Sequence, residues 1–239
     1  AFDRIAKALG DHAERFEVAI FYLKNNVEKM TEDMPRLYGN FDLVFFMHWS
    51  MALEIRETVI SRFIRPKFSK KKLILRSDID LDRTLVGIHS HDDWDDHNTR
   101  PDTKVLPPTH LVERLAAFKA VNTVSRRLYG IFTEAGLDGL YYTPNGVDDR
   151  LFTPTEALGV KDRLRVGCTG KPKRDWNKGL TEFIKPLSEL PFIEIELAGL
   201  DRMVPYEEMA QYYNGVDVFV CSSASEGFSL SVLEASACG

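Results

Sequence analysis

Short apolar runs alternate along this chain with segments in which apolar residues recur every three or four positions. The apolar runs are typical of β-strands, and the longer periodic segments are typical of amphipathic α-helices. Strands are predicted over residues 16–22, 41–47, 72–75, 84–88, 121–124, 139–143, 164–168, 193–197 and 216–221. Helices are predicted over 1–10, 109–120, 125–136, 180–190 and 206–213, and a last one begins near Ser229 or Ser231. This alternation predicts an α/β fold with parallel sheets.

A turn divides the chain into two halves. Residues 144–149, Pro-Asn-Gly-Val-Asp-Asp, combine the residue types that favour tight turns. We therefore predict an N-terminal domain over 1–146, a linker over 147–160 and a C-terminal domain over 161–239. Within the turn, Asn145 and Gly146 either form an ordinary turn or contact a ligand directly.

The charge balance argues against one class of partner. The chain carries 31 Lys and Arg residues against 36 Asp and Glu residues, a formal net charge of −5. A protein that binds duplex nucleic acid normally presents a basic face, so no nucleic-acid partner is expected. Basic residues do gather over 62–72, which is either a solvated loop or a patch that docks an anionic acceptor or a membrane surface. No apolar stretch approaches the roughly twenty residues that span a bilayer.

The cysteines indicate a reducing compartment. Cys168, Cys221 and Cys238 are odd in number and lie in apolar segments. This favours buried free thiols over a disulfide framework, and the expected localisation is cytoplasmic.

The C-terminal turn has the features of an anion-binding site. The strand over 216–221 ends in two serine residues, and Gly227 permits a close backbone approach before the last helix begins. The free N–H groups and positive dipole end of such a helix suit a diphosphate. Carboxylates are disfavoured beside phosphate, so Glu226 and Glu234 are expected to face neutral sugar hydroxyls. Phosphate and sugar in one pocket indicate a nucleotide sugar.

A basic loop follows the first strand of the second half. Residues 169–179 contain the cations Lys171, Lys173, Arg174 and Lys178. Ligands of α/β proteins bind at this end of a strand, so the loop is a candidate pyrophosphate clamp. The alternative is an ordinary solvated basic loop.

These motifs together resemble a known family, the retaining, nucleotide-sugar-dependent glycosyltransferases of the GT-B fold (glycosyl transferases group 1). Glu226 and Glu234 match the two glutamates of the family's E-x7-E signature, and residues 234–239 resemble its usual continuation. Lys178 matches the family's lysine before a glycine, and Lys171 stands where the family usually has arginine. The resemblance implies two Rossmann-like domains with parallel sheets that face each other across a cleft, the acceptor lying on the N-terminal side. It also implies that the chain is incomplete at both ends.

The resemblance further implies a donor site. Its residues would be Gly170, Lys171, Lys178, Glu226, Gly227, Phe228, Ser229, Leu230 and Glu234. In the family, Glu234 is associated with the nucleotide ribose and Glu226 with the donor sugar. Negative charge develops on the phosphate that leaves, and Lys171, Lys178 and backbone N–H groups would stabilise it without a metal. UDP or GDP is the expected nucleotide, no cofactor is expected, and retention of configuration is implied by the family alone.

Residues 89–97, His-Ser-His-Asp-Asp-Trp-Asp-Asp-His, form the other conspicuous segment. This density of His and Asp suggests a metal site, but an H-x-H-x-D-H pattern fails because Trp94 stands where histidine is required. The segment is otherwise a solvated acidic loop, or it supplies the catalytic histidine that the family places in its N-terminal domain. His89 and His91 are the candidates for that role, and His48 is a weaker one.

We therefore predict a glycosyltransferase that moves a hexosyl-type sugar from a nucleoside diphosphate to an acceptor hydroxyl, with retention and without a metal. The class of acceptor, a glycan, a lipid or a small molecule, stays open. One alternative is a nucleotide-sugar-binding protein without catalytic activity. The other is a metal-dependent hydrolase built on residues 89–97.

Overall fold

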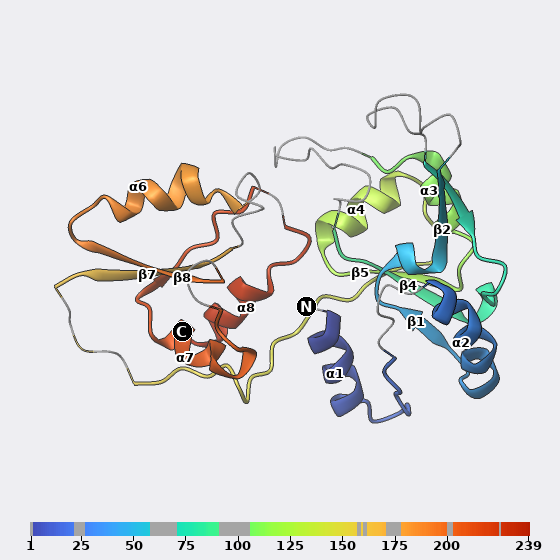
Figure 1. Cartoon of the computed structure of the whole chain (residues 1–239), viewed down its shortest axis with the longest axis horizontal. Helices are drawn as coiled ribbons and strands as arrows, with labels where there is room; N and C mark the ends of the chain where they lie inside the picture. Colours follow the sequence, from blue (N-terminus) through green and yellow to red (C-terminus); the bar gives the residue numbers. More distant parts are fainter. Residues whose placement is uncertain are drawn as a thin grey trace. The chain divides into compact units, whose positions relative to one another are not determined.

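Two compact units make up the chain. The computed structural model describes residues 2–21, 27–57, 71–90, 106–156, 159, 162–170, 178–199, 203–224 and 226–239. The described residues up to Pro144 form the first unit, and those from Asn145 onward form the second (Figure 1). Each unit has its own parallel β-sheet.

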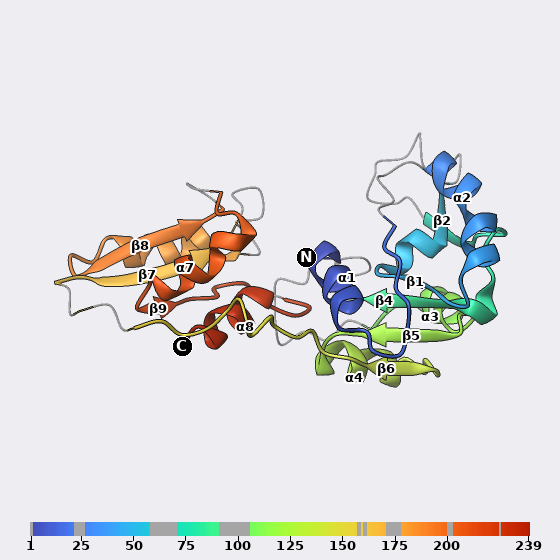
Figure 2. The ribbon, with the colours of Figure 1, turned by 90° about the horizontal axis from the view of Figure 1, so that it is seen from below.

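The first unit is built on a sheet with the strand order β1-β4-β5-β6. Its strands are β1 (Val44–Phe46), β4 (Thr84–Ile88), β5 (Ala120–Thr123) and β6 (Leu140–Tyr142). They are all parallel, and Figure 2 shows β4, β5 and β6 side by side. A separate antiparallel pair joins β2 (Leu53–Glu57) to β3 (Lys71–Leu75).

The described helices of this unit are α1 (Phe2–His12), α2 (Val27–Asn40), α3 (Thr109–Leu115) and α4 (Arg126–Glu134), with 3₁₀ turns at Trp49–Ala52 and Leu81–Arg83. The sequence of α4 explains why this segment forms a helix. The hydroxyl of Ser125 accepts a hydrogen bond from Leu128 N at 3.2 Å and so caps the first turn. Leu128, Ile131 and Phe132 recur at helical spacing and are buried, and α4 packs against β5 and β6.

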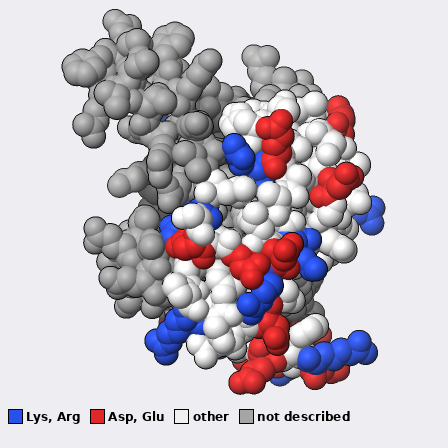
Figure 3. Space-filling view, turned by 90° about the vertical axis from the view of Figure 1, so that its right-hand side faces the viewer, with Lys and Arg blue, Asp and Glu red and all other residues white. Residues whose placement is uncertain are grey.

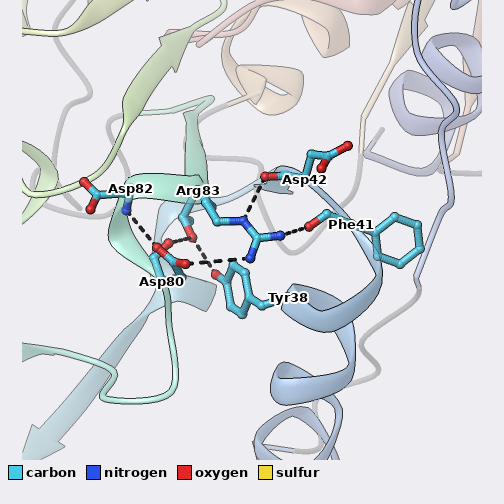
Figure 4. Close-up of polar contacts among 7 residues, drawn as sticks. Tyr38, Phe41, Asp42, Asp80, Asp82 and Arg83 are labelled. Atoms are coloured by element: carbon cyan, nitrogen blue, oxygen red, sulfur yellow. Dashed lines mark hydrogen bonds and ion pairs between the residues drawn. The ribbon is translucent and has the colours of Figure 1, made fainter.

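A polar cluster ties the end of α2 to the start of β4 (Figure 4). The hydroxyl of Tyr38 lies 2.5 Å from Thr84 Oγ1, which donates to the carbonyl oxygen of Asp80 at 2.6 Å. Arg83 donates to the carbonyl oxygen of Phe41, just beyond α2. Thr84 is fully buried, so its two hydrogen bonds satisfy a hydroxyl that water does not reach.

The second unit has a parallel sheet with the order β8-β7-β9. Its strands are β7 (Leu164–Thr169), β8 (Ile193–Ala198) and β9 (Val218–Phe219). Its described helices are α6 (Lys185–Ser188), α7 (Met209–Asn214) and α8 (Leu230–Ala237), with a π turn at Leu180–Ile184 and a 3₁₀ turn at Tyr206–Glu208. Figure 1 shows α6 on one side of β7 and β8, with α7 and α8 on the other.

Two buried clusters fill this unit. Cys168, Leu180 and Ile184 form the first, and Phe152, Tyr213 and Cys238 form the second. Phe152 comes from the stretch predicted as a linker and is 1% exposed within the second cluster. The division into domains over 1–146 and 161–239 stays a prediction.

Tyr212 fastens α7 to the sheet. Its hydroxyl lies 2.8 Å from the carbonyl oxygens of both Cys168 in β7 and Glu196 in β8. Gly167 makes this approach possible, because a Cβ atom there would lie 3.0 Å from the Tyr212 hydroxyl and 2.9 Å from Val216. Burial raises the pKa of Tyr212, so the phenol stays a hydrogen-bond donor.

One predicted strand is wrong. Residues 16–21 are irregular, and Tyr22 lies outside the described residues. Phe16 is 73% exposed. An apolar run becomes a strand only where a neighbour satisfies its backbone groups, and in the described sheet β1 pairs with β4 alone.

The sequence pattern also misses α2 and β2. Pro35 lies inside α2, and proline normally disfavours a helix interior. The strand structure of β2 depends on its pairing with β3. The other predicted strands and helices are confirmed, most of them with bounds that differ by a few residues. The strand over 216–221 is reduced to β9, and the helix over 180–190 begins as a π turn and ends at Ser188.

Charges of both signs share the surface. On the face shown in Figure 3, Lys and Arg side chains lie among Asp and Glu side chains. Of the basic run over 62–72, only Lys71 and Lys72 belong to the described residues, in β3. Among the described helices, none has the length and hydropathy that a membrane crossing requires.

The Tyr212 contact gives a first prediction. Tyr212→Phe keeps the ring and removes the hydroxyl, so it should lower the free energy of unfolding by about 1 kcal/mol, as measured by urea denaturation. The matched control is Tyr141→Phe on β6, where the side chain is 60% exposed. It should change stability by less than about 0.5 kcal/mol. Equal losses for the two variants would contradict this role of Tyr212.

Candidate functional site

The candidate site lies at the carboxyl edge of the β8-β7-β9 sheet, where parallel α/β sheets bind their ligands. Gly170 follows β7 and donates from its N–H to the carbonyl oxygen of Ala198, at the end of β8, at 3.3 Å. The segment that follows β9 leads from Cys221 to the start of α8 at Leu230. The structure therefore brings the ends of three strands and the start of one helix into a single region.

A tight contact positions Lys178. Gly179 has φ +62°, a left-handed conformation that favours glycine, and a Cβ atom there would lie 2.6 Å from the carbonyl oxygen of Ser222. The Ser222 hydroxyl donates to the carbonyl oxygen of Lys178 at 2.6 Å. The turn at Lys178 and Gly179 is therefore held against the segment that follows β9.

Lys178 and Glu226 form an ion pair. The Lys178 ammonium donates to Glu226 Oε1 across 48 positions of sequence. The two side chains are 23% and 30% exposed, so both charges lie within reach of a ligand in solution. The sequence predicted both residues for the site but not their pairing.

The start of α8 lies beside the end of β7. Thr169 Oγ1 donates to Ser231 Oγ at 3.2 Å, which joins the last residue of β7 to the first turn of α8. Ser229 begins the helix without a side-chain capping bond to any described residue, and the first turn carries no acidic residue. The first N–H groups of a helix have no partner within it, and with its dipole they favour an anion.

Glu234 has a different environment from Glu226. It lies in α8, is 5% exposed, and accepts a hydrogen bond from the Tyr213 hydroxyl at Oε2 over 2.9 Å. Glu226 is thus a partly exposed member of an ion pair, whereas Glu234 is a buried, hydrogen-bonded carboxylate. Sequence reasoning missed Tyr213, because no local pattern distinguishes it from any other aromatic residue at the end of a helix.

Some predicted site residues cannot be placed. Lys171, Lys173, Arg174 and His91 lie outside the described residues. Among the residues that are described, no three His, Cys, Asp or Glu side chains gather as metal ligands would.

In the first unit, His89 and His48 lie at the carboxyl ends of adjacent strands, β4 and β1. The His89 ring lies close to Gly87, where a Cβ atom would come within 2.8 Å of Nε2. Burial, together with His48, lowers the pKa of His89 to about 4, so its imidazole is neutral at neutral pH. A neutral imidazole can exchange hydrogen bonds with a hydroxyl but gives a phosphate no charge.

His48 has a local structural role. Its Nδ1 lies 2.7 Å from Ser50 Oγ and accepts from Ser50 N at 3.3 Å. These contacts cap the turn Trp49–Ala52. These contacts explain why a polar residue follows β1, with no need to assume that it binds a ligand.

The comparisons with known proteins agree with this geometry. Residues 193–239, which include Glu226 and Glu234, match the family described as glycosyl transferases group 1. No curated protein sequence matches the chain. Among solved structures, sucrose-phosphate synthase from Thermosynechococcus elongatus is similar, with a TM-score of 0.59 and 18% sequence identity. The match covers 91% of this chain and 61% of that one, so the chain spans about three fifths of its length.

These findings settle the fold. The chain has the α/β architecture of the GT-B fold, as the sequence predicted. The predicted resemblance to glycosyl transferases group 1 is confirmed over the matched residues.

The contact at Gly179 gives a second prediction. Gly179→Ala places a methyl group against the Ser222 carbonyl in a left-handed conformation, so it should lower the free energy of unfolding by about 2 kcal/mol or more. The matched control is Gly130→Ala in α4, where a Cβ atom meets nothing within 4 Å. Alanine should be neutral or stabilising there by about 0.5–1 kcal/mol. Tolerance of alanine at both positions in chemical denaturation would contradict the assigned contact.

The pKa of His89 gives a third prediction. The unfolded chain takes up the proton near pH 6.5, whereas the folded protein does so only near pH 4. The contribution of His89 to stability is therefore intact above pH 6.5 and is lost as the pH falls from there toward 4. Between pH 7.5 and pH 5 it should remove about 2 kcal/mol from the free energy of unfolding.

The measurement compares urea denaturation at the two pH values. His89→Gln should abolish this part of the pH dependence, whereas His110→Gln, at an exposed position of α3, should keep it. A wild-type protein and a His89→Gln variant with the same pH dependence would refute the assignment.

Proposed function

We propose that the protein is a glycosyltransferase that moves a hexosyl-type sugar from a nucleoside-diphosphate donor to an acceptor hydroxyl. The observation that carries this proposal is the Lys178–Glu226 ion pair at the carboxyl edge of the second unit's sheet. Glu226 and α8 both lie in the segment that matches glycosyl transferases group 1. The fold similarity to sucrose-phosphate synthase supports the same class of chemistry.

Lys178 is the residue we assign to the leaving group. Cleavage of a sugar–diphosphate bond leaves negative charge on the phosphate oxygens, and a fixed ammonium together with the first N–H groups of α8 stabilises that charge. Lys171, which lies outside the described residues, would add a second cation. Because this charge stabilisation comes from the protein, we propose that transfer needs no metal ion.

Glu226 is the residue we assign to the donor sugar. In the structure its carboxylate holds the Lys178 ammonium. When a donor binds, the diphosphate would replace Glu226 as the partner of Lys178, and the sugar hydroxyls would replace Lys178 as the partners of Glu226. Such an exchange leaves neither charge without a partner, which a site for a charged ligand requires.

The remaining roles complete the proposal. Glu234 would receive the nucleotide ribose, with UDP or GDP as the nucleotide. The acceptor would bind the N-terminal domain, where neutral His89 can exchange a hydrogen bond with a hydroxyl. We propose transfer with retention of configuration, the acceptor hydroxyl attacking on the face from which the diphosphate leaves.

The test combines binding with turnover. One of UDP, GDP or their sugar conjugates should raise the melting temperature, since ligand at about a hundred times its Kd adds about 2.7 kcal/mol of stability. Lys178→Ala should lower kcat about 10²–10³-fold, by analogy with the loss of one oxyanion contact. Lys185→Ala, an exposed lysine on α6, should leave kcat unchanged.

Three results would count against the proposal. Failure of every nucleotide to stabilise the protein would contradict the assignment of the donor site. Stabilisation without sugar transfer to any acceptor would favour a nucleotide-sugar-binding protein. Activity that is lost with a chelator, but is retained in Lys178→Ala, would favour the metal-dependent hydrolase.

A further inference from the structure

Glu234 accepts a hydrogen bond from a side chain of a neighbouring helix. The Tyr213 hydroxyl, at the end of α7, donates to Glu234 Oε2 in α8 at 2.9 Å. Tyr213 is 4% exposed and Glu234 is 5% exposed, so the bond lies in the interior of the second unit. A hydrogen bond to a buried carboxylate is charge-assisted and shorter and stronger than one between neutral groups.

Aromatic neighbours fix the Tyr213 ring. Its centroid lies 5.2 Å from that of Phe219 in β9 and 5.4 Å from that of Tyr212, both in edge-to-face contact. Phe152 packs against the ring from a third direction, with a centroid distance of 6.0 Å. A ring enclosed by such contacts has little rotational freedom, so its hydroxyl is a fixed donor.

A second contact couples the same two helices. The Cys238 thiol, just after α8, lies 3.9 Å from the carbonyl oxygen of Ala210 in α7 and belongs to the buried cluster with Tyr213. Burial and the nearby Glu234 carboxylate raise the pKa of the Cys238 thiol. The C-terminal end of α8 is therefore held against α7, close to the Tyr213–Glu234 hydrogen bond.

We propose that Tyr213 is a positioning residue: its hydroxyl fixes the plane of the Glu234 carboxylate so that this carboxylate selects a nucleotide by its ribose hydroxyls. This inference rests on the proposed function, which assigns the ribose to Glu234. Without the phenol, the carboxylate keeps its place in α8 but loses the hydrogen bond at Oε2 that restrains its orientation. The consequence is a loss of selectivity for ribose over deoxyribose, with the rest of the site intact.

The experiment measures the Kd of the nucleoside diphosphate that stabilises the protein, UDP or GDP, and of its 2′-deoxy and 3′-deoxy analogues. The wild type should prefer the ribonucleotide about tenfold over at least one analogue, a difference of about 1.4 kcal/mol. Tyr213→Phe should weaken the ribonucleotide about tenfold and bind that analogue as the wild type does, so the preference disappears.

Tyr212→Phe is the matched control. It removes the hydroxyl of the adjacent tyrosine, whose partners are the backbone carbonyls of Cys168 and Glu196. It should lower stability and keep the full preference for ribose. Should Tyr213→Phe not fold, Tyr213→Met, a smaller and flexible apolar side chain without a hydroxyl, carries the same test.

The outcomes separate this inference from the proposed function. A wild type that binds the nucleotide and a Tyr213→Phe variant that keeps its ribose preference would overturn the inference alone. Equal weakening of ribonucleotide and deoxy analogues would overturn it too, since Tyr213 would then act only through packing. Failure of the wild type to bind any nucleoside diphosphate would overturn both.

Discussion

The arrangement of the second unit depends on how closely α7 lies against the sheet. Gly167 has no side chain, and the Tyr212 hydroxyl occupies the space that a Cβ atom would need and reaches the carbonyl oxygens of two strands. This short distance sets the height of α7 above β7 and β8. Tyr213, the next residue, then faces the cluster with Phe152 and Cys238, and α8 packs against it. The close packing of α7 on the sheet therefore depends on the absence of a side chain at Gly167.

Glu226 and Glu234 differ chiefly in their surroundings. Glu226 lies in the segment before α8, where solvent reaches it and the Lys178 ammonium balances its charge. Glu234 lies a turn inside α8, where a phenol replaces water as its donor. An exposed ion pair is weak and easily exchanged, whereas a buried hydrogen-bonded carboxylate is held in one orientation. Glu226 therefore suits a ligand group that binds and dissociates. Glu234 suits recognition of a ligand whose hydroxyls must match one fixed orientation.

Local rules predict much of this fold. The Ser125 cap and the spacing of Leu128, Ile131 and Phe132 identify α4 from its own sequence. The run over 16–22 shows where such rules fail: its described residues, 16–21, pair with no described strand. The rules also miss α2 and β2, which are present although no local pattern predicts them. At the site, the resemblance names Lys178, Glu226 and Glu234 as separate residues. Their partners depend on long-range packing: Lys178 meets Glu226 over 48 positions, and Tyr213 meets Glu234 over 21.

The ion pair also constrains how a transferase built on this site would release its product. Under the proposed function, a nucleotide sugar would offer phosphate to Lys178 and hydroxyls to Glu226, so each charged side chain would exchange one partner for another. After transfer the sugar would be gone, and the Glu226 carboxylate would lie beside a diphosphate with no hydroxyl between them. Like charges a few ångströms apart repel strongly in a partly buried site. In such a site Lys178 would return to Glu226 only when the diphosphate leaves, so the ion pair seen in the structure would favour release of the spent nucleotide.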